Sequence, residues 1–164
     1  MPEWPRLRLG ALLRALSEEG VDFVVIGGIA AVAHGSPQFT RDLDIAYAGD
    51  DANLERLGKA LIRLGATLRG VTDDVPFVPD GRTLRHVRVL TLITPDGPLD
   101  ILAEPDGSGG YARLRANAIT ATVEGVDVRI AGLEDLIAMK KAAGRPKDRI
   151  YLEELEAIRK LQSG

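Results

Sequence analysis

The sequence predicts an α/β fold, with a mixed β-sheet flanked by helices and a helical C-terminal end, on three observations. Short apolar runs typical of buried strands alternate with segments whose leucines recur at helical spacing. Pairs of apolar segments around turn residues, at 86–102 and 119–130, predict hairpins. Two helical segments close the chain, so we expect residues 1–164 to form one domain, with its core in about 20–130 and its C-terminal helices in about 133–161.

Helices and strands alternate in the first half of the chain. Leucines at helical spacing predict a first helix that ends at Gly20. The continuous apolar run 23–26 predicts a strand buried on both faces, and Gly27-Gly28 interrupts it. The elements expected next are a short helix, a strand and a longer helix, at 29–34, 43–47 and 51–64.

The second half begins with residues 66–84, whose turn formers give no clear element. We then expect a strand over 86–94, a four-residue turn over 95–98 and a strand over 99–102. Glycine-rich residues 106–110 predict a flexible loop, and Tyr111 beside it is expected in a mobile surface segment. The last expected elements are two hairpin strands and two helices, at 119–123, 126–130, 133–143 and 146–161.

The composition of the chain limits the classes of protein and of functional site to consider. The chain of 164 residues is 45% hydrophobic and 27% charged, which is typical of a globular protein. A net charge of -3 gives no global sign of nucleic-acid binding, and the absence of cysteine excludes disulfides, thiolate metal sites and a Cys nucleophile. No secretory signal is visible, and no apolar run approaches the roughly 20 residues of a membrane-spanning helix, so we expect a cytoplasmic protein with no membrane partner.

Two carboxylates stand two residues apart at the start of a predicted strand. The period of two places Asp42 and Asp44 on one face of the sheet, while Leu43 and Ile45 point into the core. Two adjacent like charges are costly unless a cation neutralises them, and Mg²⁺ suits carboxylates that share it with substrate phosphates. Taken alone, Asp-x-Asp is also compatible with a solvated strand entry.

Two further features strengthen the metal-site interpretation. Gly27-Gly28 follows a buried strand and opens a helix, so backbone N–H groups there can face an anion such as a triphosphate. A tight strand-to-helix turn is the alternative. Asp100 lies in an apolar segment, where an ionised group is costly unless it is paired or metal-bound. If the Asp100 strand lies beside the Asp44 strand, the three carboxylates form a cluster.

Basic residues gather between the last two predicted helices. Lys140 continues the apolar stripe of its helix, so its side chain either snorkels out of the core or reaches a buried anion. Arg145 follows Gly144, a helix stop, and belongs to a cluster able to contact RNA phosphates. Asp148 falls in the first turn of the next helix, where it serves either helix-end stabilisation or catalysis. For His34 we expect packing or a local hydrogen bond.

The glycine and aspartate motifs resemble the DNA polymerase β-type nucleotidyltransferase superfamily. Residues 27–35 (GGIAAVAHG) and 40–45 (TRDLDI) reproduce its order of strand, Gly-Gly, helix and Asp-x-Asp strand, with a later Asp on another strand. Residues 134–140 and 144–148 are most similar to the AbiEii-type, toxin-related branch of small bacterial proteins. The resemblance covers about residues 20–155.

The resemblance implies the nucleotidyltransferase fold and an Mg²⁺-dependent transfer of a nucleoside monophosphate from an NTP to a hydroxyl acceptor. It implies catalytic and metal-binding roles for Asp42, Asp44 and Asp100, with two Mg²⁺ ions. The residues expected to bind the NTP are Gly27, Gly28, Thr40, Arg41, Lys140 and Arg145. The expected acceptor is RNA, at a tRNA end, or a protein side chain, and the expected partner is the cognate antitoxin of a toxin–antitoxin pair.

One position departs from the pattern of the resemblance. Many relatives carry an arginine two residues before the threonine, where this chain has Gln38, and Arg41 next to Asp42 is then a nearby source of positive charge. Two alternatives therefore stay open. One is a small-molecule nucleotidyltransferase of the antibiotic-modifying type, and the other is a non-catalytic binding protein or antitoxin with the same fold. We also expect a partner or self-association to complete the acceptor site.

Overall fold

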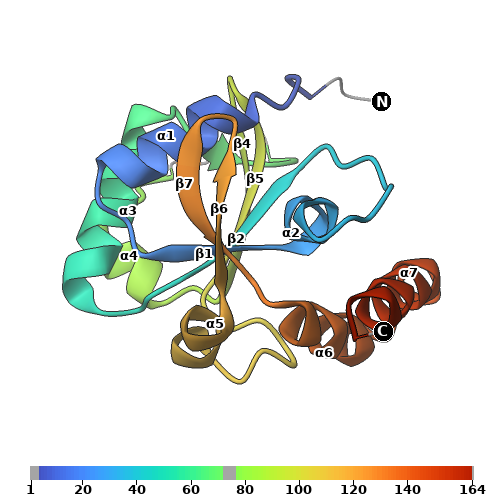
Figure 1. Ribbon diagram of the computed structural model, residues 1–164. Helices are drawn as coiled ribbons and strands as arrows, with labels where there is room; N and C mark the ends of the chain where they lie inside the picture. The colour runs from blue at the N-terminus through green and yellow to red at the C-terminus, as the bar shows by residue number, and fades with distance from the viewer. Residues whose placement is uncertain (1–3, 72–76, 164) are drawn as a thin grey trace.

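A mixed β-sheet forms the centre of the computed structural model, which describes residues 4–71 and 77–163 (Figure 1). Its strands are β1 (Phe23–Ile26), β2 (Leu43–Tyr47), β3 (Thr67–Leu68), β4 (Val89–Thr94), β5 (Gly97–Leu102), β6 (Ile119–Val123) and β7 (Val126–Ile130). The helices are α1 (Leu9–Glu18), α2 (Gly27–Ala33), α3 (Asp51–Arg63), α4 (Gly81–Arg85), α5 (Tyr111–Asn117), α6 (Leu133–Ala143) and α7 (Asp148–Ser163). The strand order is β3-β4-β5-β2-β1-β7-β6. The predicted fold class is thereby confirmed.

Strand pairing at the middle of the sheet sets the position of the acidic residues. β2 pairs antiparallel with β1 on one side and parallel with β5 on the other. Leu43 lies opposite Leu99, and Ile45 lies opposite Ile101, and all four side chains are fully buried. Because side chains alternate along a strand, burial of these four fixes the register of β2 against β5 and turns Asp44 to the other face.

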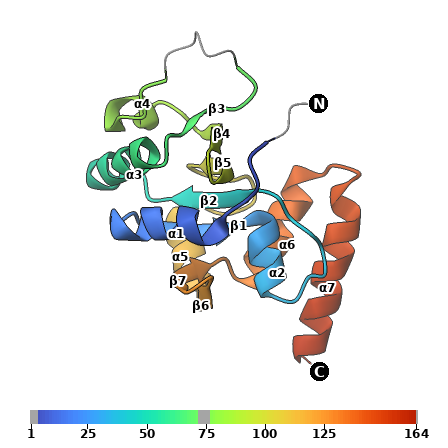
Figure 2. The same ribbon diagram turned by 90° about the horizontal axis from the view of Figure 1, so that it is seen from above.

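Helices gather in two groups around the sheet (Figures 1 and 2). α1 and α3 pack together, whereas α6 and α7 form an antiparallel pair in which α6 packs against α2 (Figure 2). Gly144 closes α6 in the left-handed conformation at φ +62°, which confirms it as a helix stop. The turn at Gly144 brings α7 back along α6. This second group lies at the end of the sheet where β1 ends and β2 begins.

Several connecting segments differ from what the sequence indicated. Residues 66–84 contain β3 and α4, although 72–76 fall outside the described residues. Asp80 caps α4 by accepting a hydrogen bond from the Thr83 N–H, a signal that the prolines around it obscured. The expected four-residue turn has only two residues, because Gly97 pairs with Thr94 within the β4–β5 hairpin. The strand expected from residue 86 begins at Val89.

The glycine-rich loop also differs from its prediction. Ser108 within it is fully buried, and Gly107 lies against the backbone of Ala138 in α6. Tyr111 opens helix α5, which sequence reasoning missed, rather than lying in a mobile surface segment. A helix of seven residues carries too little periodicity to be recognised. Among the described residues, no helix is long and apolar enough to cross a membrane.

Candidate active site

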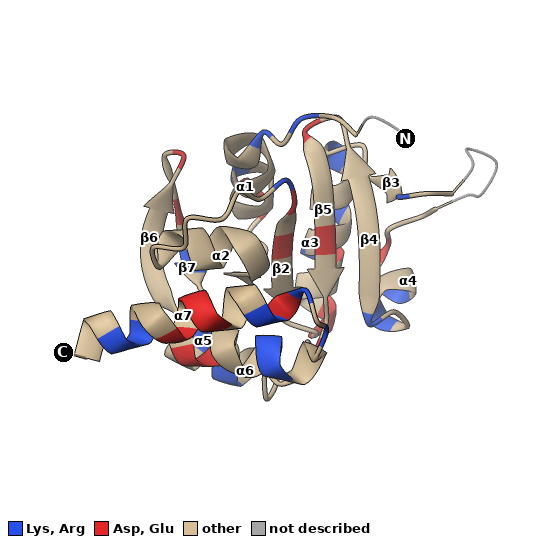
Figure 3. Cartoon of the chain, turned by 90° about the vertical axis from the view of Figure 1, so that its right-hand side faces the viewer, with Lys and Arg blue, Asp and Glu red and all other residues tan. Residues whose placement is uncertain are grey.

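Strand pairing brings the three predicted carboxylates together. Asp42 directly precedes β2, and Asp44 is its second residue. Asp44 lies opposite Asp100 in the parallel pairing of β2 with β5. The acidic bands on these two strands accordingly lie side by side in Figure 3. The Asp100 strand therefore does lie beside the Asp44 strand, which the sequence alone could not establish. The carboxylate cluster lies at the end of β1.

Asp44 is the electrostatic centre of this cluster. Its Oδ1 atom is buried and has no hydrogen-bond partner in the described part of the chain. Burial, together with the negative charges of Asp100 and Asp42, raises the pKa of Asp44 to about 7, against the lowering effect of Lys140 and Arg69. A buried carboxylate with a free oxygen and two acidic neighbours is stabilised by a bound cation.

Asp100 differs from Asp44 in having a cationic partner. The Arg69 Nη2 atom donates to Asp100 Oδ1 at 2.7 Å, and both side chains are largely buried. Burial raises the pKa of Asp100, while the Arg69 guanidinium acts to lower it. Sequence reasoning missed Arg69 because it lies in the segment 66–84, where no element could be recognised.

The donor set suits a divalent cation. Carboxylate oxygens are ligands that Mg²⁺ prefers. Asp44 Oδ1 could bind the ion without first breaking a hydrogen bond to a described residue. Within residues 4–71 and 77–163, however, no three acidic or histidine side chains form a ready-made metal cluster. Asp42 and Asp44 are therefore the residues that fit the ion directly, and Asp100 is engaged with Arg69.

Gly27 and Gly28 leave room for the polar side chains of the site. A Cβ atom on Gly27 would clash with the carboxylate of Asp44, and Gly27 has φ +67°, a conformation that side chains disfavour. A Cβ atom on Gly28 would stand 2.7 Å from Thr40 Oγ1. The glycine pair is thus required by the close approach of Asp44 and Thr40, in addition to the turn into α2.

The basic side of the site is held by Asp148. Lys140 Nζ lies 3.1 Å from Asp148 Oδ1, and Arg145 Nε donates to Asp148 Oδ2 at 2.8 Å. Lys140 also lies over the ring of Tyr151, 4.7 Å from its centroid. Burial acts to raise the pKa of Asp148, but the bonds from Arg145 and Lys140 outweigh it and lower that pKa. The Asp148 carboxylate thus orders two cations, which goes beyond stabilising a helix end.

A polar cavity of about 230 Å³ joins the two sides. The residues that line it are Gly27, Gly28, Thr40, Asp42, Asp44, Lys140, Arg145, Lys147, Asp148 and Tyr151. Seven of the predicted site residues therefore share one cavity, whereas sequence reasoning did not assign Lys147 or Tyr151 to it. Asp100 reaches this group through its pairing with Asp44.

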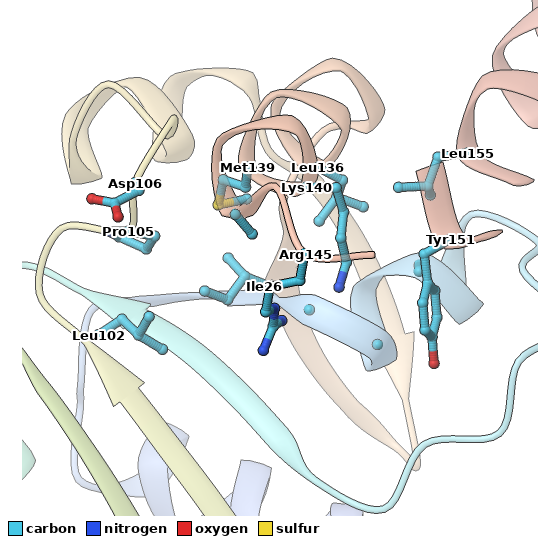
Figure 4. A pocket seen from close by; sticks show the side chains of 14 residues that line it. Ile26, Leu102, Pro105, Asp106, Leu136, Met139, Lys140, Arg145, Tyr151 and Leu155 are labelled. Carbon is cyan, nitrogen blue, oxygen red and sulfur yellow. The ribbon is translucent and has the colours of Figure 1, made fainter. Parts of the chain in front are cut away.

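A second cavity of about 240 Å³ adjoins the first and has mostly apolar walls (Figure 4). Its walls include Leu102 from β5, Met139 from α6 and Leu155 from α7. Figure 4 shows Lys140 and Tyr151 at its edge, and both side chains also line the polar cavity. A ligand with an anionic and an apolar part can therefore span both spaces.

The remaining predicted residues lie apart from the cavity. Arg41 is exposed, with its guanidinium 5.8 Å from the ring centroid of Phe39. Gln38, which stands where many relatives have arginine, donates from Nε2 to Glu154 Oε1 at 2.5 Å and so ties its loop to α7. His34 Nε2 hydrogen-bonds to the Ala131 carbonyl at 2.8 Å, a contact across 97 residues of sequence rather than a local bond.

The family can be stated from the sequence pattern together with this geometry. A family profile described as "Nucleotidyl transferase AbiEii toxin, Type IV TA system" matches residues 11–150, most of the chain. The chain belongs to the AbiEii nucleotidyltransferase family. The resemblance found from the glycine and aspartate motifs is confirmed, as is the prediction that the chain is a nucleotidyltransferase. No curated protein matches the sequence of this AbiEii-family chain.

Solved structures share the fold at low identity. The lincosamide antibiotic adenylyltransferase LnuA with bound lincomycin is 18% identical, with a TM-score of 0.61 over 93% of this chain and 99% of that one. ANT(2'')-Ia in complex with adenylyl-2''-tobramycin is 15% identical, with a TM-score of 0.55 over 94% and 86%. A nucleotidyltransferase-like protein from Paracoccidioides brasiliensis is 18% identical, with a TM-score of 0.57 over 93% and 74%.

Proposed function

We propose that this AbiEii-family chain transfers a nucleoside monophosphate from an NTP to a hydroxyl acceptor in an Mg²⁺-dependent reaction. The observation that carries the proposal is the buried Oδ1 of Asp44, which has no partner in the described part of the chain and lines one cavity with two basic side chains. An acidic wall that needs a cation and a basic wall that suits phosphates are the two halves of a site for a metal-bound polyphosphate.

Asp42 and Asp44 are the proposed holders of Mg²⁺, and Asp100 supports them from the neighbouring strand. When bound, Mg²⁺ would neutralise the carboxylates and stabilise the attacking and leaving oxygens of the transfer. In the reaction the acceptor oxygen bonds to the α-phosphorus, the bond between the α-phosphorus and its bridging oxygen breaks, and pyrophosphate leaves. Asp100 is the proposed carboxylate that helps the acceptor hydroxyl lose its proton.

Lys140 and Arg145 are the proposed partners of the triphosphate. Asp148 orients both cations, so that little side-chain entropy is lost when phosphate oxygens replace water around them. Gly27, Gly28 and Thr40 form the opposite wall of the same cavity and allow the phosphates to approach the backbone. The exposed position of Arg41 gives it at most a role at the edge of this site.

The acceptor that we propose is an RNA end, such as that of a tRNA, or a protein hydroxyl. The toxin–antitoxin description of the family supports a biological role as a toxin with a cognate antitoxin partner. An NTP donor is consistent with a cytoplasmic protein. The apolar cavity beside the carboxylates favours one alternative, a small antibiotic-like acceptor, and the bound ligands of LnuA and ANT(2'')-Ia give that alternative its substrate class.

Label transfer tests the proposal. Each α-³²P-labelled NTP is incubated with Mg²⁺, the protein and total RNA, bulk protein, or a panel of aminoglycosides and lincosamides. We expect label in RNA or protein, and none with Asp44→Asn. Label confined to the small molecules selects the alternative acceptor. Equal labelling by wild type and Asp44→Asn rejects catalysis at this site.

A non-catalytic role is the second alternative, because Gln38 binds Glu154 where many relatives have an arginine. Titration calorimetry of Mg-NTP against the folded chain separates it from the proposed enzyme. We expect binding of at least one Mg-NTP, weakened by Lys140→Met. Absence of binding for all four NTPs, with the chain still folded, would favour a binding protein or antitoxin.

A further inference from the structure

Arg69 is a charged side chain that the proposed reaction does not use. It directly follows β3, and its backbone N–H donates to the Thr91 carbonyl at 3.0 Å. Its guanidinium donates to the Leu92 carbonyl from Nε at 3.2 Å and from Nη2 at 2.8 Å. The same Nη2 atom donates to Asp100 Oδ1. Backbone and side chain together therefore hold this guanidinium in one position against the carboxylate.

This arrangement makes two neighbouring carboxylates unequal. Asp44 and Asp100 lie opposite each other in the sheet, yet Asp44 Oδ1 has no hydrogen-bond partner among the described residues, while Asp100 Oδ1 is ion-paired with Arg69. A guanidinium stays protonated at every pH that a folded protein tolerates. The positive charge of the Arg69 guanidinium therefore stays beside Asp100 at all these pH values, as long as the ion pair is intact.

The ion pair between Arg69 and Asp100 is not needed to hold the strands of the sheet in register. β4 and β5 already pair continuously from Val89–Leu102 to Thr94–Gly97. Arg69 directly follows β3, the strand beyond β4, and its side chain reaches across β4 to a residue on β5. A bond that spans a strand and ends on a carboxylate of the reaction centre has its main effect on charge at that centre.

We propose that Arg69 is a built-in counter-cation that occupies Asp100 in the substrate-free protein. The carboxylate cluster then takes a single divalent cation, at Asp42 and Asp44, because a second cation beside Asp100 would meet the fixed charge of Arg69. A second cation enters only when a nucleotide brings compensating negative charge and Asp100 is released. This inference rests on the proposed metal-dependent function and adds an order to the loading of its site.

Titration of the NTP-free protein with Mn²⁺, followed by the electron paramagnetic resonance signal of the free ion, tests this order. We expect one Mn²⁺ per wild-type chain. Arg69→Met, of similar length but uncharged, is expected to bind Mn²⁺ about tenfold more tightly and to take a second ion, since the site gains one net negative charge. Wild type that binds two ions or none, or Arg69→Met with the wild-type isotherm, would overturn the proposal.

Two further variants keep the test decisive. Arg69→Met combined with Asp100→Asn is expected to return to one ion, because the carboxylate that Arg69 occupied is gone. If circular dichroism shows that Arg69→Met does not fold, Arg69→Lys replaces it. Lys keeps the charge but cannot reach Leu92 and Asp100 together, so we expect tighter Mn²⁺ binding than wild type, and an unchanged affinity overturns the proposal.

Label transfer by the same preparations separates this inference from the proposed function. Transfer by wild type together with an isotherm that Arg69→Met leaves unchanged rejects the counter-cation and retains the enzyme. The expected Mn²⁺ pattern without any transfer retains the counter-cation and rejects catalysis.

Discussion

The acidic and basic sides of the cavity are built in different ways. The acidic side rests on backbone pairing, since Asp44 and Asp100 are opposed by the same register that buries the leucines beside them. The basic side rests on side chains, since a single carboxylate, Asp148, holds both Lys140 and Arg145 between two helices. A substitution on the acidic side should therefore change charge and leave geometry, whereas one on the basic side should change both.

The largest effect is expected from Asp44→Asn. The variant keeps the shape of the side chain but removes the charge that a metal needs, so transfer should fall by roughly a thousandfold. In EDTA at pH 8 the same variant should be more stable than wild type, by about 1–2 kcal/mol, because it removes the charge from a buried carboxylate whose Oδ1 has no hydrogen-bond partner among the described residues. Transfer rates and urea unfolding measure the two effects. A destabilised variant would show that Asp44 is needed for folding, which contradicts a backbone-built acidic side.

On the acidic side, the features that depend on the pattern within a single strand could be predicted from the sequence. Alternation placed Asp42 and Asp44 on one face, and the apolar residues around Asp100 marked it as a costly charge. Their adjacency could not be derived, because the pairing of β2 with β5 is parallel and spans a long stretch of intervening chain. The role of Arg69 could not be predicted either, because Arg69 lies in a segment with no periodicity.

The basic side was predictable only in part. Lys140 stood out because a lysine broke an apolar helical stripe, and Gly144 marked the turn that folds α7 back. Nothing in the sequence distinguished a helix-capping Asp148 from one that binds two cations, because both interpretations place it in a first helical turn. Arg41 was assigned to the site from its position beside Asp42, but it precedes β2, and its exposed side chain lies over the ring of Phe39.

A second test of the acidic side is Gly27→Ala, with Gly125→Ala as its matched control. Both glycines have positive φ, at +67° and +79°, so each alanine should cost about 1 kcal/mol of stability through backbone strain. Only at Gly27 does the new Cβ meet Asp44, since nothing lies within 4 Å of the position at Gly125. Displacement of Asp44 should lower transfer by roughly a hundredfold. Similar transfer rates for the two variants would argue against close contact at Gly27.

The basic side should respond to pH through Asp148. Its pKa is lowered in the folded protein from the ordinary value of 3.8, so the stability it contributes is present above about pH 4 and is lost as the pH falls through the lower, folded pKa. Asp148→Asn should therefore cost about 2 kcal/mol in urea unfolding at pH 7, and the difference from wild type should shrink near pH 3. A difference that is independent of pH would assign the loss to packing instead of charge.

The smallest effect, and the sharpest comparison, comes from two adjacent lysines at the end of α6. Lys140→Met removes a half-buried charge that lines the cavity, and binding of Mg-NTP should weaken about tenfold, in keeping with the loss of one charge-assisted contact.

Lys141→Met is the control, because Lys141 is exposed and faces Glu156 at 3.8 Å, away from Asp148. Its nucleotide affinity should stay within about twofold of wild type, as expected of a surface ion pair. Calorimetry at two salt concentrations adds a further criterion, since screening acts on Lys141 more than on Lys140. Equal losses for both variants would mean that the basic side attracts nucleotide by its overall field, and the defined position that Asp148 gives to Lys140 would then have no part in binding.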